Sequence, residues 1–492
     1  MKKQKAKPRI FVKEWQELHP YHKPASSDFY FTRLSNQLLE IIDEFIQSVV
    51  SEKAKRTIAL SVAAYFEDVI SEFGLWQGFT KKHCKMYGKK LPFYETTEDY
   101  IPEEINPEDV LFLIWSIMEL ELKETKGMML NSENPFIIAL GMELFHVLEE
   151  EYETAPENEN LYHFFTDIPE YEDFVDFRNV AAWLFYDSYL MSPFTDGILE
   201  KALKDVKRND EYREAIVYTT TYELVFSIPC GPLALKTYEW MAAIAGEDTD
   251  LGKMLLKTQF KYKAPKTYLV TDTNDTGLFL LPFDSDTPIY LFNDTFSKNT
   301  NLKSGDAALC NLIYYNEKWE LNGFLVNYSA KEYEKEREEA KRHKTNVEYS
   351  KNLFLKANNN KPVRYFKDRT ECEDFFNVAF KPKEKMYHEH LKDYTNLISY
   401  VCDENATTTI SDIATYVKDK DNPCYNKKEA EENGLVVLTR FALDKFIIDY
   451  FIKNKLLPDL SMNSLRGAKH GKKLVQENLD FLFRFFQPMS FK

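Results

Sequence analysis

The spacing at which apolar residues recur changes near residue 265. From about residue 28 to 260 the spacing is that of a helix, and one continuous stripe ends at Gly74, formed by Ile58, Val62, Phe66, Val69 and Phe73. Beyond that point, short runs rich in β-branched and aromatic residues alternate with turn-forming residues. Because helices and strands bury residues at different spacings, the chain must contain regions of different architecture.

Several helix starts in the first region are marked by proline. In NPEDVLFLIWSIMELELK, Asn106 is suited to cap the helix, proline is tolerated in the first turn, and the two acidic residues that follow favour the positive helix start. Pro135 opens another such segment, and YEDFVDFRNVAAWLFYDSYL is a further helical pattern. We predict a mostly helical N-terminal domain over residues 28–262, preceded by an N-terminal tail and lead-in segment over 1–27.

Five strand-like runs follow the change of spacing: TYLVTD, LFLLPF, PIYLFN, ALCNLIYY and WELNGFLVNY. The segments between them are rich in Asn, Asp, Gly and Ser, which form turns. This pattern predicts a small antiparallel β barrel or sandwich in the middle of the chain, over residues 263–330. The next segment, KEYEKEREEAKRHK, places acidic residues three or four positions before basic ones, as in Glu338 and Arg342, and predicts a charged helix or linker over 331–360.

A mixed pattern returns in the last part of the chain. VRYF and LISYVCD are strand-like, whereas ISDIATYVKD, VVLTRFALDKFIIDYFIKN and KKLVQENLDFLFRFF are helical. We therefore predict an α+β C-terminal domain over residues 361–492, and an α+β fold for the whole chain. The final segment should dock as one helix through an apolar face formed by Val475, Leu479, Leu482 and Phe486.

Composition narrows the class of protein. The net charge of −16 opposes non-specific binding to nucleic acid and to anionic lipid, and between 266 and 328 there are four lysines, no arginine and eight carboxylates. The basic start MKKQKAKPR is not followed by an apolar run, and the apolar run LFLIWSIM is far shorter than the roughly 20 residues that span a membrane. We expect a soluble cytoplasmic protein with no membrane segment.

The six cysteines are spread through the chain, and the closest two are 22 residues apart. This spacing matches neither a disulfide framework nor a metal-binding or redox pair of cysteines. We therefore expect reduced thiols at Cys84, Cys230, Cys310, Cys372, Cys402 and Cys424.

Segments from both ends of the chain carry a family resemblance: IFVKEWQELHPYHKP, YFEDVISEFGLWQGFTKKHCKMYGKKLPFY, INPEDVLFLIW, DIATYVKDKDNPCYNKKEAEENG and KLVQENLDFLFRFF. Together they resemble an uncharacterised family of bacterial proteins known only as a domain of unknown function. The resemblance covers most of the chain and contains no catalytic motif. It implies a cytoplasmic bacterial protein without an established activity, and it assigns no functional residues.

The motifs that would indicate catalysis are missing from the sequence. There is no G-x-S-x-G, no H-E-x-x-H and no Rossmann G-x-G-x-x-G, and GAKHGKK lacks the spacing and the final Ser or Thr of a P-loop. Glu67 and Asp68 are adjacent carboxylates, which we interpret as part of a polar helix face, continued by Ser71 and Glu72. His388-Glu389-His390 is expected to be helical, which separates its two imidazoles. We expect no cofactor and no metal, and the missing motifs favour a protein without enzymatic activity but do not decide the question.

Two segments are candidate binding sites. In YGKKLPFY, proline predicts an extended strap, which either packs over the helical domain with its lysines solvated or forms a recognition loop. Its candidate residues are Tyr87, Lys89, Lys90, Phe93 and Tyr94. The second segment is basic in an acidic protein, and it either binds an anion or an acidic partner or simply pairs with the protein's own carboxylates. Its candidate residues are Arg466, Lys469, Lys472 and Lys473.

These observations favour a non-catalytic multidomain protein that acts through protein–protein recognition, with a protein as its partner. An enzyme whose site is assembled from distant residues is one alternative. A nucleic-acid-associated or anion-binding factor that uses the basic C-terminal segment is the other, although the overall charge argues against nucleic acid.

Overall fold

The computed structural model describes ten stretches of the chain: residues 9–21, 23–46, 50–96, 98–126, 129–165, 173–207, 213–260, 266–295, 302–381 and 394–492. The chain forms two compact units. Unit 1 comprises the chain up to Pro265, then Cys310–Leu325 and the terminal Lys492, whereas unit 2 comprises Lys266–Leu309 and Val326–Phe491. The five-part division predicted from the sequence stays a prediction.

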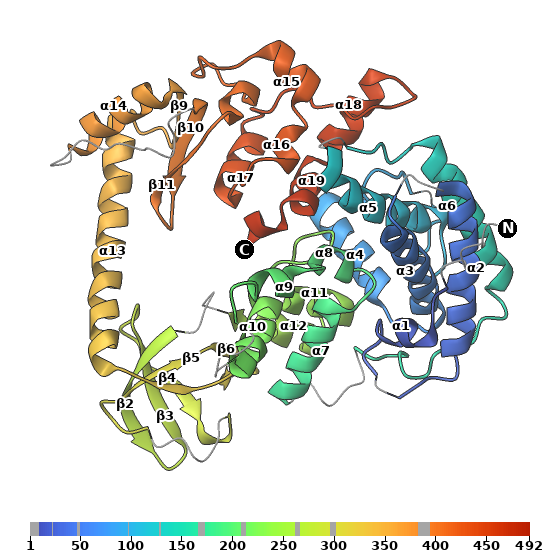
Figure 1. Ribbon diagram of the computed structural model, residues 1–492, viewed down its shortest axis with the longest axis horizontal. Helices are drawn as coiled ribbons and strands as arrows, with labels where there is room; N and C mark the ends of the chain where they lie inside the picture. The colour runs from blue at the N-terminus through green and yellow to red at the C-terminus, as the bar shows by residue number, and fades with distance from the viewer. Residues whose placement is uncertain are drawn as a thin grey trace. The chain divides into compact units, whose positions relative to one another are not determined.

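Unit 1 is mainly helical, as predicted (Figure 1). Its helices are α1 (Val12–Gln16), α2 (Asp28–Ile46), α3 (Glu52–Ile70), α4 (Leu75–Tyr87), α5 (Pro107–Lys126), α6 (Pro135–Glu151), α7 (Phe174–Tyr186), α8 (Ser192–Thr195), α9 (Ile198–Ala202), α10 (Arg213–Ser227), α11 (Thr237–Ala245) and α12 (Asp250–Leu256). The predicted stripe on α3 is confirmed, because Ile58, Val62 and Phe66 are fully buried. This face packs α3 against α2 and α5.

Three short strands complete unit 1: β1 (Gln259–Phe260), β6 (Leu312–Tyr315) and β7 (Lys318–Leu321). β6 pairs antiparallel with both β1 and β7. Tyr315 at the end of β6 is fully buried, and its ring stacks on Phe177 of α7 with the ring centroids 4.0 Å apart. A hairpin that is distant in sequence therefore supplies part of the core of the helical unit.

Unit 2 begins with the sheet β2 (Lys266–Asn274), β3 (Gly277–Pro282), β4 (Ile289–Phe292), β5 (Ala307–Cys310) and β8 (Val326–Tyr328), and the short 3-10 helix η2 (Asn293–Thr295) follows β4. The strand order is β4-β3-β2-β5-β8. The predicted β region is confirmed as a curled sheet whose β2–β3, β3–β4 and β5–β8 pairs are antiparallel. Two of the five predicted runs each contain two strands, since ALCNLIYY holds β5 and β6, and WELNGFLVNY holds β7 and β8.

The charged segment forms one helix, α13 (Ala330–Ala357), of 28 residues. Tyr333 and Phe354 are the buried residues at its two ends, and none of the side chains between them is buried. A helix that is polar on all sides bridges other elements through solvent. The expected pair of Glu338 with Arg342 does not form, and Nε of Arg342 donates instead to the carbonyl oxygen of Glu338 (3.4 Å). Arg337 and Lys341 reach off the helix to Asp286, whereas Lys335 lies 3.9 Å from Glu339 of the same helix.

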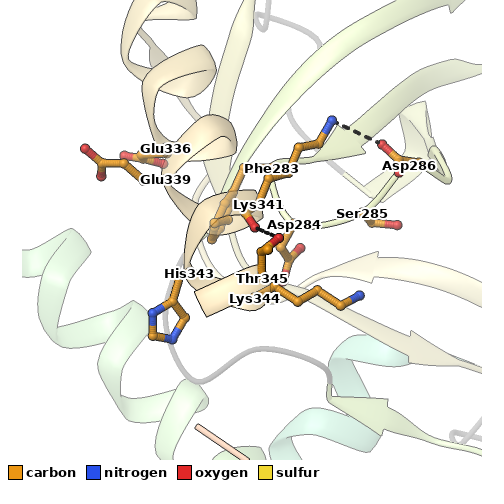
Figure 2. Close-up of a pocket in the computed structure, with 11 residues that line it drawn as sticks. Phe283, Asp284, Ser285, Asp286, Glu336, Glu339, Lys341, His343, Lys344 and Thr345 are labelled. Carbon is orange, nitrogen blue, oxygen red and sulfur yellow. Dashed lines mark hydrogen bonds and ion pairs between the residues drawn. The ribbon is translucent and has the colours of Figure 1, made fainter. Parts of the chain in front are cut away.

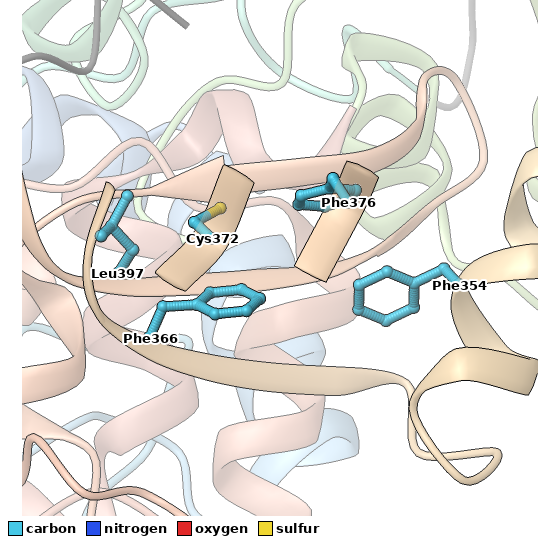
Figure 3. Packing of buried hydrophobic residues seen from close by; sticks show 5 residues of the cluster. All are labelled: Phe354, Phe366, Cys372, Phe376 and Leu397. Atoms are coloured by element: carbon cyan, nitrogen blue, oxygen red, sulfur yellow. The ribbon is translucent and has the colours of Figure 1, made fainter. Parts of the chain in front are cut away.

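The last part of unit 2 has the predicted α+β character. It comprises β9 (Val363–Asp368), α14 (Arg369–Phe380), β10 (Thr395–Cys402), β11 (Ala406–Ile410), η4 (Ile413–Tyr416), α15 (Lys427–Asn433), α16 (Val436–Thr439), α17 (Lys445–Lys453), α18 (Ala468–Glu477), α19 (Leu479–Phe486) and η5 (Pro488–Phe491). The sheet order is β11-β10-β9, with both pairs antiparallel. Its side chains meet α13 and α14 in a buried cluster of Phe354, Phe366, Cys372, Phe376 and Leu397 (Figure 3).

Candidate functional site

The strap Tyr87–Tyr94 follows α4 directly. Gly88 ends the helix in the left-handed region, at a φ of 74°, which glycine adopts without strain. Leu91 is fully buried and Phe93 is 5% exposed, and the Phe93 ring meets Trp115 of α5 edge-on at 4.7 Å. Tyr94 donates a hydrogen bond to the carbonyl of Ser132 (3.0 Å). The apolar residues of the strap therefore pack on the helices, as the first interpretation requires.

The side chain of Lys90 is held against the fold rather than fully solvated, which corrects one part of that interpretation. Lys90 is half-buried, and its amine donates a hydrogen bond to the carbonyl oxygen of Tyr100 (2.6 Å) and lies 4.8 Å from the centre of the Tyr100 ring. The carbonyl oxygen of Lys89 accepts a hydrogen bond from Nδ1 of His83 (2.7 Å). Burial lowers the pKa of His83 to about 4, so this imidazole is neutral at physiological pH. A recognition role for Tyr87 and its neighbours stays a prediction.

The basic C-terminal residues lie in and just before α18. Arg466, Lys469 and Lys473 are exposed. Lys472 lies 3.6 Å from a carboxylate oxygen of Asp459, and Lys473 lies 3.9 Å from Glu477. Two of the four cations therefore have carboxylate neighbours, as the alternative interpretation of this segment expects. An anion site here stays a prediction.

The glycine and the apolar face of the same segment have structural roles. Gly471 is buried inside α18, where an added Cβ would lie 2.0 Å from the carbonyl oxygen of Met462. The expected single helix is interrupted at Asn478, which separates α18 from α19. Even so, the expected docking face is buried at Val475, Leu482 and Phe486.

Glu67 and Asp68 do not lie on a polar helix face, so that interpretation is wrong. Their exposed fractions are 1% and 3%. Asp68 accepts hydrogen bonds from the amides of Gly74, Leu75 and Trp76 and thereby caps α4. It also accepts one from the hydroxyl of Tyr189 (2.6 Å). Adjacent residues on α3 are both buried because each has distant polar partners, which a local pattern cannot show.

Glu67 pairs with a histidine from the start of the chain. Its carboxylate lies 2.5 Å from Nε2 of His19 and accepts a further hydrogen bond from Nδ2 of Asn158 (2.8 Å). The other imidazole nitrogen, Nδ1, donates to the carbonyl of Trp15 (2.8 Å). Burial lowers the pKa of His19, but the Glu67 carboxylate more than offsets this, so the pKa is raised.

A third buried carboxyl, Asp109, lies in the first turn of α5. It accepts hydrogen bonds from the hydroxyls of Tyr65 and Tyr100, both at 2.7 Å. Burial raises the pKa of Asp109 to about 7 and that of Asp68 to about 6. Both carboxyls therefore titrate near neutrality, although neither lines the groove beside α13 or the pocket beside α10.

A groove of about 960 Å³ lies in unit 2, between α13 and the turn after β3 (Figure 2). The turn contributes Phe283 and the polar residues Asp284, Ser285 and Asp286. The helix contributes Glu336, Glu339, Ala340, Lys341, His343, Lys344 and Thr345. Figure 2 shows Lys341 reaching the turn at Asp286 and Lys344 extending toward the same side. The turn therefore carries two carboxylates, whereas the helix carries both carboxylates, Glu336 and Glu339, and lysines, Lys341 and Lys344.

Arg337 holds the turn against the helix. Its Nη1 donates to the carbonyl oxygens of Pro282 (3.1 Å) and Ser285 (2.7 Å), and its Nη2 donates to Asp286. Asp284 is paired with Lys266 at 2.5 Å. Lys344, in contrast, forms no ion pair with any residue that the structure describes. The carboxylates of the groove are therefore engaged inside the fold, whereas one of its lysines is available.

Metal binding finds no support in the described residues, which contain no group of three or more His, Cys, Asp or Glu side chains arranged for a metal ion. His388, Glu389 and His390 lie outside those residues. All six cysteines are free thiols. Within the part of the chain that the structure describes, no helix is both long enough and apolar enough to cross a membrane.

Comparison with known proteins identifies the family of the chain. Residues 9–275 and 315–487 match the family model described as "Protein of unknown function (DUF3843)". The intervening stretch, 276–314, holds most of the sheet of unit 2. No curated protein and no solved structure matches the chain. Because the match covers most of the chain, including residues of both units, the protein belongs to the DUF3843 family of proteins of unknown function.

Proposed function

We propose that the protein acts by recognising another protein at the groove between α13 and the turn Phe283–Asp286. The observation that supports this is Lys344, which lines the groove and forms no ion pair with a described residue, whereas Asp284 and Asp286 are paired inside the fold. Complementary charge across an interface gives specificity in register and orientation. A segment that fits must place a carboxylate against Lys344.

The mixed charge favours a protein over a nucleic acid. A groove that follows a phosphate backbone needs continuous positive charge, whereas four carboxylates interrupt the positive charge of this groove: Asp284, Asp286, Glu336 and Glu339. The exposed central part of α13 adds a surface beyond the groove, which includes Tyr349 at 63% exposed. A charged helix of a partner protein is therefore the occupant that we infer.

Site-specific photo-crosslinking in the host cell tests this proposal. A photoreactive residue at Thr345, which lines the groove, should crosslink one partner protein, whereas the same residue at Glu334, which is exposed on the same helix outside the groove, should not. The partner would then be purified and its affinity measured. Lys344→Glu should weaken binding at least about tenfold, because it reverses the unpaired charge, whereas Lys331→Glu outside the groove should not.

Two results would overturn the proposal. Crosslinking with equal yield from Thr345 and Glu334 would show that the groove is not the contact. Equal affinity of the purified partner for the parent and for Lys344→Glu would show that the charges of the groove do not contribute. A crosslink to nucleic acid rather than protein would assign the groove to the other class of partner.

A further inference from the structure

Arg178 is a buried arginine on α7 of unit 1, and no carboxylate in the described part of the chain pairs with it. Arg178 is 6% exposed, and its guanidinium lies 4.1 Å from the ring centre of Tyr222, 5.3 Å from that of Tyr218 and 5.8 Å from that of Phe174. Among the described residues its only hydrogen bond runs from Nη2 to the hydroxyl of Tyr218 (2.6 Å). Nε is completely buried and has no acceptor. The aromatic rings and this one hydrogen bond therefore leave at least one buried donor of the guanidinium, Nε, unsatisfied.

Lys55 shows how carboxylates can compensate a buried cation. Lys55, which is 3% exposed, pairs with Asp43 at 3.0 Å and with Glu52 at 2.8 Å. Removing a charge from water costs several kcal/mol unless a counter-ion or a set of hydrogen bonds compensates, as they do for this lysine. Arg178 forms no ion pair with any described residue. Among the described residues, its positive charge is therefore compensated only by aromatic rings and one hydroxyl.

The surface next to Arg178 is aromatic. Tyr218, which accepts its hydrogen bond, is 37% exposed, and the ring of Phe324 meets that of Tyr218 edge-on at 5.4 Å and is 46% exposed. A pocket of about 340 Å³ lies beside α10, the helix that carries Tyr218. It is lined by Arg213, Glu214, Val217, Tyr218, Thr221 and Tyr222. A ligand that reaches the guanidinium would therefore place an apolar or aromatic body against these rings.

We propose that Arg178 anchors the carboxylate of an aromatic acid, a binding site separate from the groove beside α13. Tyr218 and Tyr222 line the pocket and also contact the guanidinium, so a carboxylate bound in the pocket approaches Arg178 beside these two rings. The aromatic ring of the ligand packs on Tyr218 and Phe324. The Tyr218 hydroxyl holds Nη2 in the free protein and yields that donor to the ligand.

Titration of the full-length protein with benzoate, followed by NMR or calorimetry, tests the site. The parent should bind benzoate more tightly than acetate, which lacks the ring, and should not bind benzamide, which lacks the charge. Arg178→Gln should weaken benzoate binding at least about tenfold. Arg364→Gln is the matched control, because Arg364 lies 4.3 Å from the Phe375 ring centre in unit 2, and it should bind benzoate as the parent does.

A second variant keeps the test decisive if Arg178→Gln does not fold. Phe324 is half exposed, so Phe324→Ala should fold, and it should weaken benzoate binding severalfold without affecting acetate. Benzoate binding that is unchanged in Phe324→Ala, or in a folded Arg178→Gln, would overturn the proposal. Inorganic phosphate that binds the parent as tightly as benzoate does would also overturn it, since the anion would then not be selected by its shape and ring.

Discussion

Phe93 combines a strained backbone conformation with a buried side chain. It adopts a φ of 65°, in the left-handed region that bulky residues rarely occupy, while its ring is buried against Trp115. The packing of the ring must outweigh the cost of this backbone conformation, which is roughly 1 to 2 kcal/mol. The strap is therefore fixed by its aromatic residues rather than by its backbone preference.

Truncation of this ring should be costly. Phe93→Ala should lower the free energy of unfolding by about 3 to 5 kcal/mol, because a buried aromatic side chain is lost. Lys90→Ala should cost about 1 kcal/mol, since it removes a charged hydrogen bond to the Tyr100 carbonyl, whereas Lys89→Ala should be close to neutral. Thermal or urea unfolding of the three variants provides the measurement. A Phe93→Ala protein as stable as the parent would contradict the buried strap.

The buried carboxyls predict how stability depends on pH. Asp68 and Asp109 have pKa values of about 6 and about 7 in the folded protein, above the ordinary 3.8. At a pH between 3.8 and these raised values, the folded protein holds protons that the unfolded chain has lost. The free energy of unfolding therefore falls as the pH rises through this range. The raised pKa of His19 acts in the same direction, because its stabilisation is complete below pH 6.5 and is lost above its folded-state pKa.

Replacing one of these carboxyls measures how much it contributes to the pH dependence of stability. Asp109→Asn keeps an acceptor for the hydroxyls of Tyr65 and Tyr100 but cannot ionise. The slope of the unfolding free energy between about pH 5 and about pH 7 should become shallower by up to about 1.4 kcal/mol per pH unit. Urea unfolding across this range measures the slope. The exposed Glu150→Gln is the control, and a slope that is equal in Asp109→Asn and the parent would show that Asp109 does not titrate there.

At the scale of elements, the spacing of apolar residues predicted the helices whose burial depends on one face. The stripe from Ile58 to Phe73 predicted α3 because burial on one face needs only helical spacing. The same helix holds Glu67 and Asp68, whose burial depends on His19 and Tyr189. The spacing of residues within α3 cannot show those partners, so the sequence predicted that Glu67 and Asp68 lie on a polar helix face. The break at Asn478 and the Arg178 site depend on tertiary contacts in the same way.

Helix α18 offers a test in which the usual effect of a substitution should be reversed. Gly→Ala inside a helix normally stabilises by about 1 kcal/mol. At Gly471 the added Cβ would meet the Met462 carbonyl oxygen at 2.0 Å, so backbone must move, and Gly471→Ala should instead destabilise by about 1 to 3 kcal/mol. Thermal unfolding measures the sign. Lys469→Ala on the exposed side should be nearly neutral, and a Gly471→Ala protein that melts above the parent would contradict this close approach.

At the scale of the whole molecule, the two units share the chain in an interleaved order. Unit 1 takes residues up to Pro265 and then the hairpin of β6 and β7, while unit 2 takes the segments on either side of that hairpin. Sequence spacing located the change of architecture near residue 265, but it could not show that the chain returns to the helical unit at Cys310. Such a return depends on the pairing of β6 with β1 and on the packing of Tyr315.

Fragments would test this arrangement. A fragment of residues 1–265 lacks β6 and β7 and leaves the ring of Phe177 without Tyr315, so it should unfold at a lower temperature than a fragment of residues 1–328, or fail to form a cooperative fold. Circular dichroism during heating compares the two. A cooperative transition of the shorter fragment at the temperature of the longer one would instead support the boundary near 262 that the sequence predicts.

The interleaving also has a consequence for synthesis on the ribosome. When residue 265 has been translated, the helical unit still lacks its hairpin, which is separated from it by the 44 residues from Lys266 to Leu309. The nascent chain must therefore keep the site for Tyr315 unfilled while the first strands of the other unit emerge. At elongation rates of about 5 to 20 residues per second, this exposure lasts for several seconds, long enough for a chaperone to bind the apolar surface around Phe177.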